Sequence, residues 1–158
     1  MILPSGWIAA PLQALAVDEP SAITDGPFGS NLKTQHYTSS GPRVIRLQNI
    51  GDGDFIDQKA HISEAHYLTL SRHQARSGDL VVAMLGDRLP RACMVPADLG
   101  PAIVKADCAR MRPHWGLNSR YLLYALNSDP VRSQCEVHGV GRPRLKLSEI
   151  RQLIVPVA

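Results

Sequence analysis

The spacing of apolar residues along the chain is typical of short β-strands joined by turns. Residues 43–50 alternate Val, Ile and Leu with polar side chains, which predicts a strand with one buried face. Residues 79–85 form an almost continuous apolar run, which is typical of a strand buried on both faces. Residues 102–111 are expected to form another strand or a pair of strands. Residues 7–12 are expected to form a short strand, followed by a brief helical turn that ends near Val17.

Capping residues mark two short helices in the last third of the chain. Asn118 and Ser119 can cap a helix over Tyr121–Leu126, because their side chains accept hydrogen bonds from free backbone N–H groups. The Asp-Pro pair at 129–130 is the signature of an N-cap followed by proline in the first turn. This second helix is expected to continue to about His138.

Two other stretches are less regular. Residues 62–75 have an ambiguous pattern, with Ser71 as the candidate N-cap of a short helix. Residues 18–41 are rich in Gly, Pro, Ser, Thr and Asn, which predicts a long loop, and loops of this length are usually functional. The two tryptophans, Trp7 and Trp115, lie at the edges of predicted elements and are expected to anchor the core.

These elements combine into an α+β fold, a curved and mainly antiparallel β-sheet with a few short helices, in a single domain over residues 1–158. A length of 158 residues with 44% hydrophobic and 20% charged residues is that of an ordinary globular protein. No stretch approaches the roughly 18 consecutive apolar residues of a membrane span, and no basic residue precedes the apolar start of the chain. We therefore expect a cytoplasmic protein that does not contact membranes.

The cysteines and histidines do not form a pattern of metal ligands. Cys93, Cys108 and Cys135 are an odd number and include no C-x-x-C spacing, so neither a disulfide framework nor a zinc site is expected. They are predicted to be buried thiols. No cofactor or metal is expected.

The net charge of +3 is small, but it is unevenly distributed along the chain. Residues 139–158 hold four basic side chains against one acid, whereas residues 51–64 hold four acids against one base. An uneven field of this kind suits a partner that is anionic on one side, such as nucleic acid.

Five short segments together resemble a known family, the target recognition domains of the DNA-specificity subunits of type I restriction–modification systems. They follow one another in the order of that family and cover nearly the whole chain: L-P-S-G-W at 3–7, T-D-G-P-F-G-S-N-L-K at 24–33, G-P-R-V-I-R-L-Q-N-I at 41–50, S-G-D-L-V-V-A-M-L-G at 77–86, and G-V-G-R-P-R-L-K-L-S-E-I at 139–150 with I-V-P-V after it.

The resemblance implies a binding role without catalysis. Such a domain reads one half of a bipartite target in double-stranded DNA, while a methyltransferase (modification) subunit and a restriction subunit of the same complex carry the chemistry. The chain ends at Ala158, where the family usually continues into a long spacer helix. The spacer helix is therefore expected to be absent from this chain.

Polar side chains in turns marked by glycine or proline are the candidates for contact with DNA. Arginine can form two hydrogen bonds with guanine, and Asn or Gln can do so with adenine, while Lys and Arg also bind phosphates. The candidates for reading bases are Asn31, Gln35, Arg88, Arg91 and Arg142. The candidates for phosphates are Lys33, Arg144 and Lys146.

Two alternative functions remain open on the sequence alone. Asp57 and Lys59 match the D-x-K half of a magnesium-dependent nuclease site, with Asp25 or Asp52 as the second carboxylate. The chain could instead be an interaction module of a modification complex that does not bind DNA itself.

Overall fold

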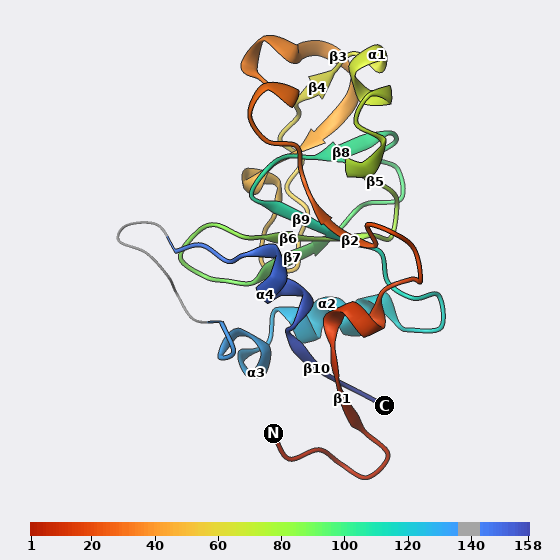
Figure 1. Cartoon of the computed structure of the whole chain (residues 1–158), viewed down its shortest axis with the longest axis vertical. Helices are drawn as coiled ribbons and strands as arrows, with labels where there is room; N and C mark the ends of the chain where they lie inside the picture. Colours follow the sequence, from red (N-terminus) through yellow and green to blue (C-terminus); the bar gives the residue numbers. More distant parts are fainter. Residues whose placement is uncertain (136–142) are drawn as a thin grey trace.

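The strands of the computed structural model, which describes residues 1–135 and 143–158, form three sheets (Figure 1). We call them the upper sheet (β4-β3-β8-β5), the central sheet (β2-β9-β6-β7) and the terminal sheet (β1-β10). The strands are β1 Ile8–Pro11, β2 Ile23–Asp25, β3 Tyr37–Ile45, β4 His61–Ile62, β5 Gln74–Ala75, β6 Leu80–Ala83, β7 Arg91–Met94, β8 Ala102–Val104, β9 Cys108–Met111 and β10 Ile154–Val157.

Short helices connect and cover these strands. The α-helices are α1 Glu64–Leu68, α2 Ser119–Leu126, α3 Asp129–Arg132 and α4 Leu147–Arg151. The 3-10 turns are η1 Leu12–Leu15, η2 Gly29–Asn31, η3 Thr34–His36, η4 Leu47–Asn49 and η5 Ser71–His73. None of the helices in the described part of the chain is long and apolar enough to cross a membrane. The α+β class expected from the sequence is confirmed.

The central sheet is antiparallel throughout and forms the main core. All four residues of β6 are buried, as the apolar run in the sequence predicts. Val81 is paired with Arg110 of β9 on one side and with Cys93 of β7 on the other. Residues 102–111 form the pair β8 and β9, because the chain turns at Asp107, whose φ of +68° lies in the left-handed region.

The upper sheet has a small core of its own. Its buried residues are Leu32, Val44, Ile62, Leu70 and Ile103. Within this sheet β3 and β8 run parallel, so the fold is mainly but not wholly antiparallel. In Figure 1 this sheet lies above the central one, with α1 beside it at the top of the view.

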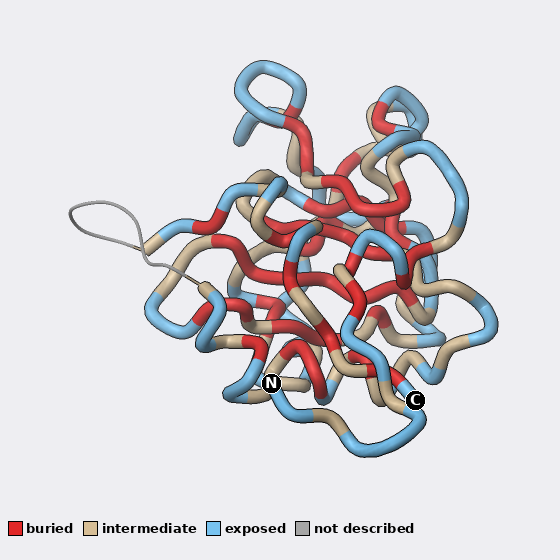
Figure 2. Tube along the Cα trace, turned by 60° about the horizontal axis from the view of Figure 1, so that its bottom comes forward, coloured by how far each residue is buried: buried red, intermediate tan, exposed pale blue. Residues whose placement is uncertain are grey.

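The terminal sheet brings the two ends of the chain together below the central sheet. Ile8 of β1 is paired with Val157 of β10. The Tyr121 hydroxyl of α2 donates a hydrogen bond to the Pro156 carbonyl, and the Tyr121 ring packs edge-on against Trp7 with ring centroids 5.8 Å apart. Figure 2 shows buried segments crossing the centre of the molecule, while exposed residues concentrate in the peripheral loops.

The predicted helix starts are confirmed only in part. The Asn118 side chain accepts hydrogen bonds from the backbone N–H groups of Arg120 and Tyr121, at 3.0 and 3.1 Å, and so caps α2 as expected. Helix α3 starts after Ser128 rather than after Asp129, and it ends at Arg132. Its predicted extension is therefore wrong for residues 133–135, and the remainder up to His138 lies outside the described residues.

Other boundaries in the first half of the chain also differ from the prediction. The expected strand at 43–50 ends at Ile45, because the Asn49 side chain accepts a hydrogen bond from the Arg46 backbone N–H at 2.8 Å and closes a 3-10 turn. The expected loop at 18–41 contains β2 and the first half of β3. Helix α1 is capped by Ser63, whose Oγ accepts from the His66 backbone N–H, whereas Ser71 only begins a 3-10 turn.

Trp115 is not a core residue. It is 88% exposed, in the connection between β9 and α2, with its ring tilted against His114 at a centroid distance of 5.2 Å. Its neighbours make the contacts with the core instead: the His114 N–H donates to the Leu15 carbonyl at 2.9 Å, and Leu117 packs against the core. The expectation of a core anchor is wrong for Trp115, whereas Trp7 packs on Tyr121.

Candidate nucleic-acid interface

The candidate DNA-contacting residues lie in two separate places. Asn31, Lys33 and Gln35 belong to the loop 29–36, which lies beside α1 in the upper sheet. Arg88, Arg91 and Arg144 lie at the end of the hairpin formed by β6 and β7 in the central sheet. Lys146 is exposed at the start of α4. Arg142 lies outside the described residues.

The closing segment of the chain lies alongside the β6–β7 hairpin. The Gly86 N–H donates to the Pro143 carbonyl at 3.0 Å, and the Leu145 N–H donates to the Met84 carbonyl at 2.7 Å. Leu85 and Arg144 form an isolated antiparallel bridge between these bonds. Residues 84–86 and 143–145, about 60 positions apart in the sequence, are thus brought together at one end of the central sheet (Figure 1).

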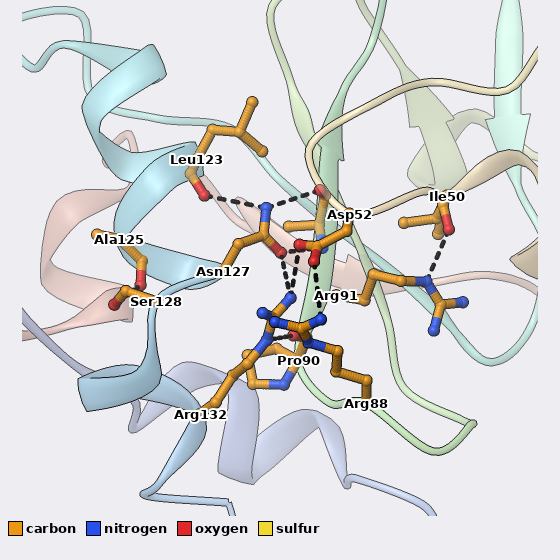
Figure 3. A network of polar contacts seen from close by, with 11 residues as sticks. Ile50, Asp52, Arg88, Pro90, Arg91, Leu123, Ala125, Asn127, Ser128 and Arg132 are labelled. Atoms are coloured by element: carbon orange, nitrogen blue, oxygen red, sulfur yellow. Dashed lines mark hydrogen bonds and ion pairs between the residues drawn. The ribbon is translucent and has the colours of Figure 1, made fainter.

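A network of ion pairs supports the hairpin from the side of α3 (Figure 3). We call Asp52, Arg88, Arg91 and Arg132 the hairpin cluster. Asp52 binds two arginines at once, with Oδ1 2.8 Å from Nη2 of Arg132 and Oδ2 3.3 Å from Nη1 of Arg88. The hydrogen bond from Arg132 and the charges of the nearby arginines lower the pKa of Asp52.

The arginines of this region differ in how strongly they are held. The side chain of Arg132 is 9% exposed, and its Nε also donates to the Pro90 carbonyl at 2.9 Å. Arg91 donates from Nε to the Ile50 carbonyl at 2.7 Å. Arg88 is 62% exposed, and Arg144 is 52% exposed and paired with Asp107. Arg88 and Arg144 therefore keep more than half of their side-chain surface exposed, where a partner can reach it.

The loop 29–36 is fastened to α1 by two histidines. His66 Nε2 lies 2.7 Å from the Asn31 carbonyl, and the Lys33 backbone N–H donates to His36 Nδ1 at 2.8 Å. The two imidazole rings stack with centroids 4.0 Å apart. Desolvation, the neighbouring His66 and the charge of Lys33 lower the pKa of His36. The side chains of Asn31, Lys33 and Gln35 remain exposed on this fastened loop.

Two residues that support the hairpin of the candidate interface were not predicted from the sequence. Arg132 lies on a predicted helix, and no local signal shows that it reaches Asp52, 80 positions earlier. Asn127 bonds to both backbone groups of Ala92 and also accepts from Arg132 Nη2 at 3.1 Å. The only hint in the sequence is that Asn127 directly follows a predicted helix.

Two of the three carboxylates of the nuclease alternative, Asp57 and Asp52, are paired with arginine. Asp57 Oδ1 lies 2.5 Å from Nη2 of Arg43, and this hydrogen bond lowers the pKa of Asp57. Asp52 is held by two arginines, as described above. Within residues 1–135 and 143–158, no group of three or more His, Cys, Asp or Glu side chains is arranged to hold a metal ion.

The fold of the chain is similar to that of several solved structures. Residues covering 99% of the chain superpose on a structure from work on complex assembly and conformational transition of the type I restriction–modification system, with a TM-score of 0.68 and 18% identity. The same share superposes on the HsdS subunit from Thermoanaerobacter tengcongensis, with a TM-score of 0.64 and 16% identity. The fold is that of a type I S-subunit segment.

A third solved structure has the same fold over the same share of the chain. The type I S subunit from M. genitalium superposes on 99% of the chain with a TM-score of 0.56 and 13% identity. The chain spans 34–36% of the length of these three proteins. No protein-family model and no curated protein matches the sequence. The three superpositions confirm the target-recognition-domain-like fold expected from the sequence.

Proposed function

We propose that the chain reads one half of a bipartite double-stranded DNA target as the recognition part of a type I specificity subunit. The observation that carries this proposal is the meeting of the closing segment and the β6–β7 hairpin, which places exposed Arg88 and Arg144 at one end of the central sheet. Arginines presented by turns on a rigid sheet are suited to enter a DNA groove.

The two groups of candidates have different roles in this proposal. Arg88, Arg91 and the residues of loop 29–36 with amide side chains, Asn31 and Gln35, read base edges. Lys33, Arg144 and Lys146 bind phosphates and fix the position of the protein on the duplex. Arg142 belongs with the base-reading group as a prediction from the sequence.

The chain has no catalytic role in this proposal. A methyltransferase subunit and a restriction subunit supply the chemistry in the complete complex, and this chain supplies the target sequence. The proposal draws support from the fold shared with S subunits along 99% of the chain.

Salt-dependent binding to a labelled duplex tests the proposal. We expect Arg144→Ala to weaken binding uniformly across sequences and to reduce the slope of log affinity against log salt by about one. The matched control is Arg120→Ala, which removes an exposed arginine of α2, outside the hairpin cluster and loop 29–36. An Arg144→Ala variant that binds like Arg120→Ala would remove the closing segment from the interface. A wild-type protein that binds no duplex at low salt would favour the interaction module instead.

A further inference from the structure

The carboxylate of Asp52 links a buried arginine to an exposed one. Its Oδ1 accepts from Arg132, whose side chain is 9% exposed, and its Oδ2 pairs with Arg88, whose side chain is 62% exposed. A carboxylate placed between two guanidinium groups can restrict the orientation of the more mobile one.

Backbone hydrogen bonds on both sides of Asp52 fix the turn that carries it. The turn that carries it is closed by the Gly51 N–H, which donates to the Asp54 carbonyl at 2.8 Å. The Gly53 N–H donates to the Ala92 carbonyl of β7 at 3.0 Å, and Gly53 has a φ of +91°, which favours glycine. The turn is thus fixed to β7, the second strand of the hairpin.

Arg132 is fixed as firmly from the other side. It donates to the Pro90 carbonyl, to Asp52 and to Asn127, and these three partners come from three different segments of the chain (Figure 3). Arg132 therefore stays in place when Arg88 moves. Through its hydrogen bond it also holds Asp52 in place.

We infer that Asp52, anchored by Arg132, is a positioning residue that orients Arg88 for reading a base edge. This inference rests on the proposed function. It adds an explanation of how the protein distinguishes the base that Arg88 contacts. A single contact to Asp52 leaves the other donors of Arg88 available, because a guanidinium carries five N–H groups. The negative charge of Asp52 also weakens the attraction of this arginine for phosphates, which favours base contact over backbone contact.

The test uses two duplexes, one enriched by the wild-type protein from a randomised pool and one with the same composition in shuffled order. We expect Asp52→Asn to reduce the ratio of the two affinities about tenfold, because the amide places a donor against one guanidinium. Affinity for the shuffled duplex is expected to stay equal or to rise, since a negative charge has been removed. Asp54→Asn, which makes the same charge change two residues away on an exposed side chain, is the matched control.

A second variant keeps the ion pair of Asp52 with Arg132 intact. Arg88→Lys retains the charge but not the planar fork, and we expect it to reduce the ratio as Asp52→Asn does. In an Arg88→Ala background, Asp52→Asn is expected to change the ratio no further. Equal ratios for Asp52→Asn and Asp54→Asn would overturn the inference, as would equal losses of affinity for both duplexes. A wild-type protein that enriches no sequence from the randomised pool would overturn the proposed function and the inference with it.

Discussion

The side-chain amide of Asn127 is hydrogen-bonded to both backbone groups of Ala92. The Ala92 N–H donates to Oδ1 at 2.9 Å, and Nδ2 donates to the Ala92 carbonyl at 3.0 Å. Ala92 belongs to β7, the last strand in the order of the central sheet, so the amide pairs backbone groups that this sheet leaves free. The end of α2 is thereby fixed to the second strand of the candidate DNA-reading hairpin.

Removal of this amide is expected to destabilise the fold. Asn127→Ala breaks both bonds to Ala92 and leaves Arg132 with one acceptor fewer, which we expect to cost about 2 kcal/mol of the free energy of unfolding. Urea unfolding of the wild type and the variant measures this loss. Asn118→Ala, which removes a helix cap, is the comparison and is expected to cost about 1 kcal/mol. A smaller loss for Asn127→Ala than for Asn118→Ala would contradict this reading of the contact.

Asp79 forms a buried ion pair with Arg112, which we expect to contribute more to the free energy of unfolding than the Asn127 contact does. Its oxygens lie 3.1 and 3.0 Å from Nε and Nη2 of Arg112, and its Oδ2 also accepts from the Arg76 backbone N–H at 2.8 Å. The side chain of Asp79 is 3% exposed. Asp79→Ala removes the buried carboxylate that binds Nε and Nη2 of Arg112, and losing one partner of a buried ion pair typically costs about 3–5 kcal/mol.

The control for Asp79 is an exposed partner of the same arginine. Glu19 lies 3.6 Å from Nη1 of Arg112 and its side chain is 52% exposed. Glu19→Ala is expected to change the free energy of unfolding by less than about 1 kcal/mol. Denaturant curves for the two variants should therefore separate clearly, and coincident curves would show that burial of Asp79 contributes nothing.

The sequence predicted those parts of the fold that depend on local pattern. The apolar run of β6 and the cap of α2 by Asn118 need only neighbouring residues to be recognised. The resemblance of five short segments was sufficient to predict the fold class.

The features that could not be predicted from the sequence depend on contacts between distant segments. The end of β3 at Ile45 is set by Asn49, whose Nδ2 donates to the carbonyls of Ile56 and Gln58 across the following turn. The partner of Arg132 lies 80 residues away, and that of Arg144 lies 37 residues away. No periodicity or capping rule encodes such pairs, because they arise only when strands of the central sheet have assembled.

The loop 29–36 is expected to loosen in acid. The pKa of His36 is lowered from 6.5 in the folded protein, so the unfolded chain binds the proton more readily. The contribution of neutral His36 to stability is thus complete above about pH 6.5 and is lost as pH falls below that value. An NMR titration of the His36 ring should give a midpoint below 6.5, and His66→Gln should move that midpoint upward. A midpoint at or above 6.5 in the wild type would contradict the stacked arrangement.

The cysteines are expected to resist alkylation in the folded protein. Burial raises the pKa of Cys93 and Cys108 to about 12 and that of Cys135 to about 11, so hardly any reactive thiolate exists near pH 8. Mass spectrometry after iodoacetamide treatment should show little labelling without denaturant and three labels in denaturant. Cys135, which is only partly buried, should react first. Fast labelling of Cys93 in the native protein would disagree with its place in the central sheet.

Selection from a pool of randomised duplexes at low salt, followed by sequencing, tests the central claim most directly. If the chain reads one half of a DNA target, the wild-type protein enriches one short asymmetric motif. Arg88→Ala then relaxes that motif at one position, while Arg120→Ala leaves it unchanged. Binding that enriches no motif would leave only sequence-independent attraction to phosphates and would contradict the claim.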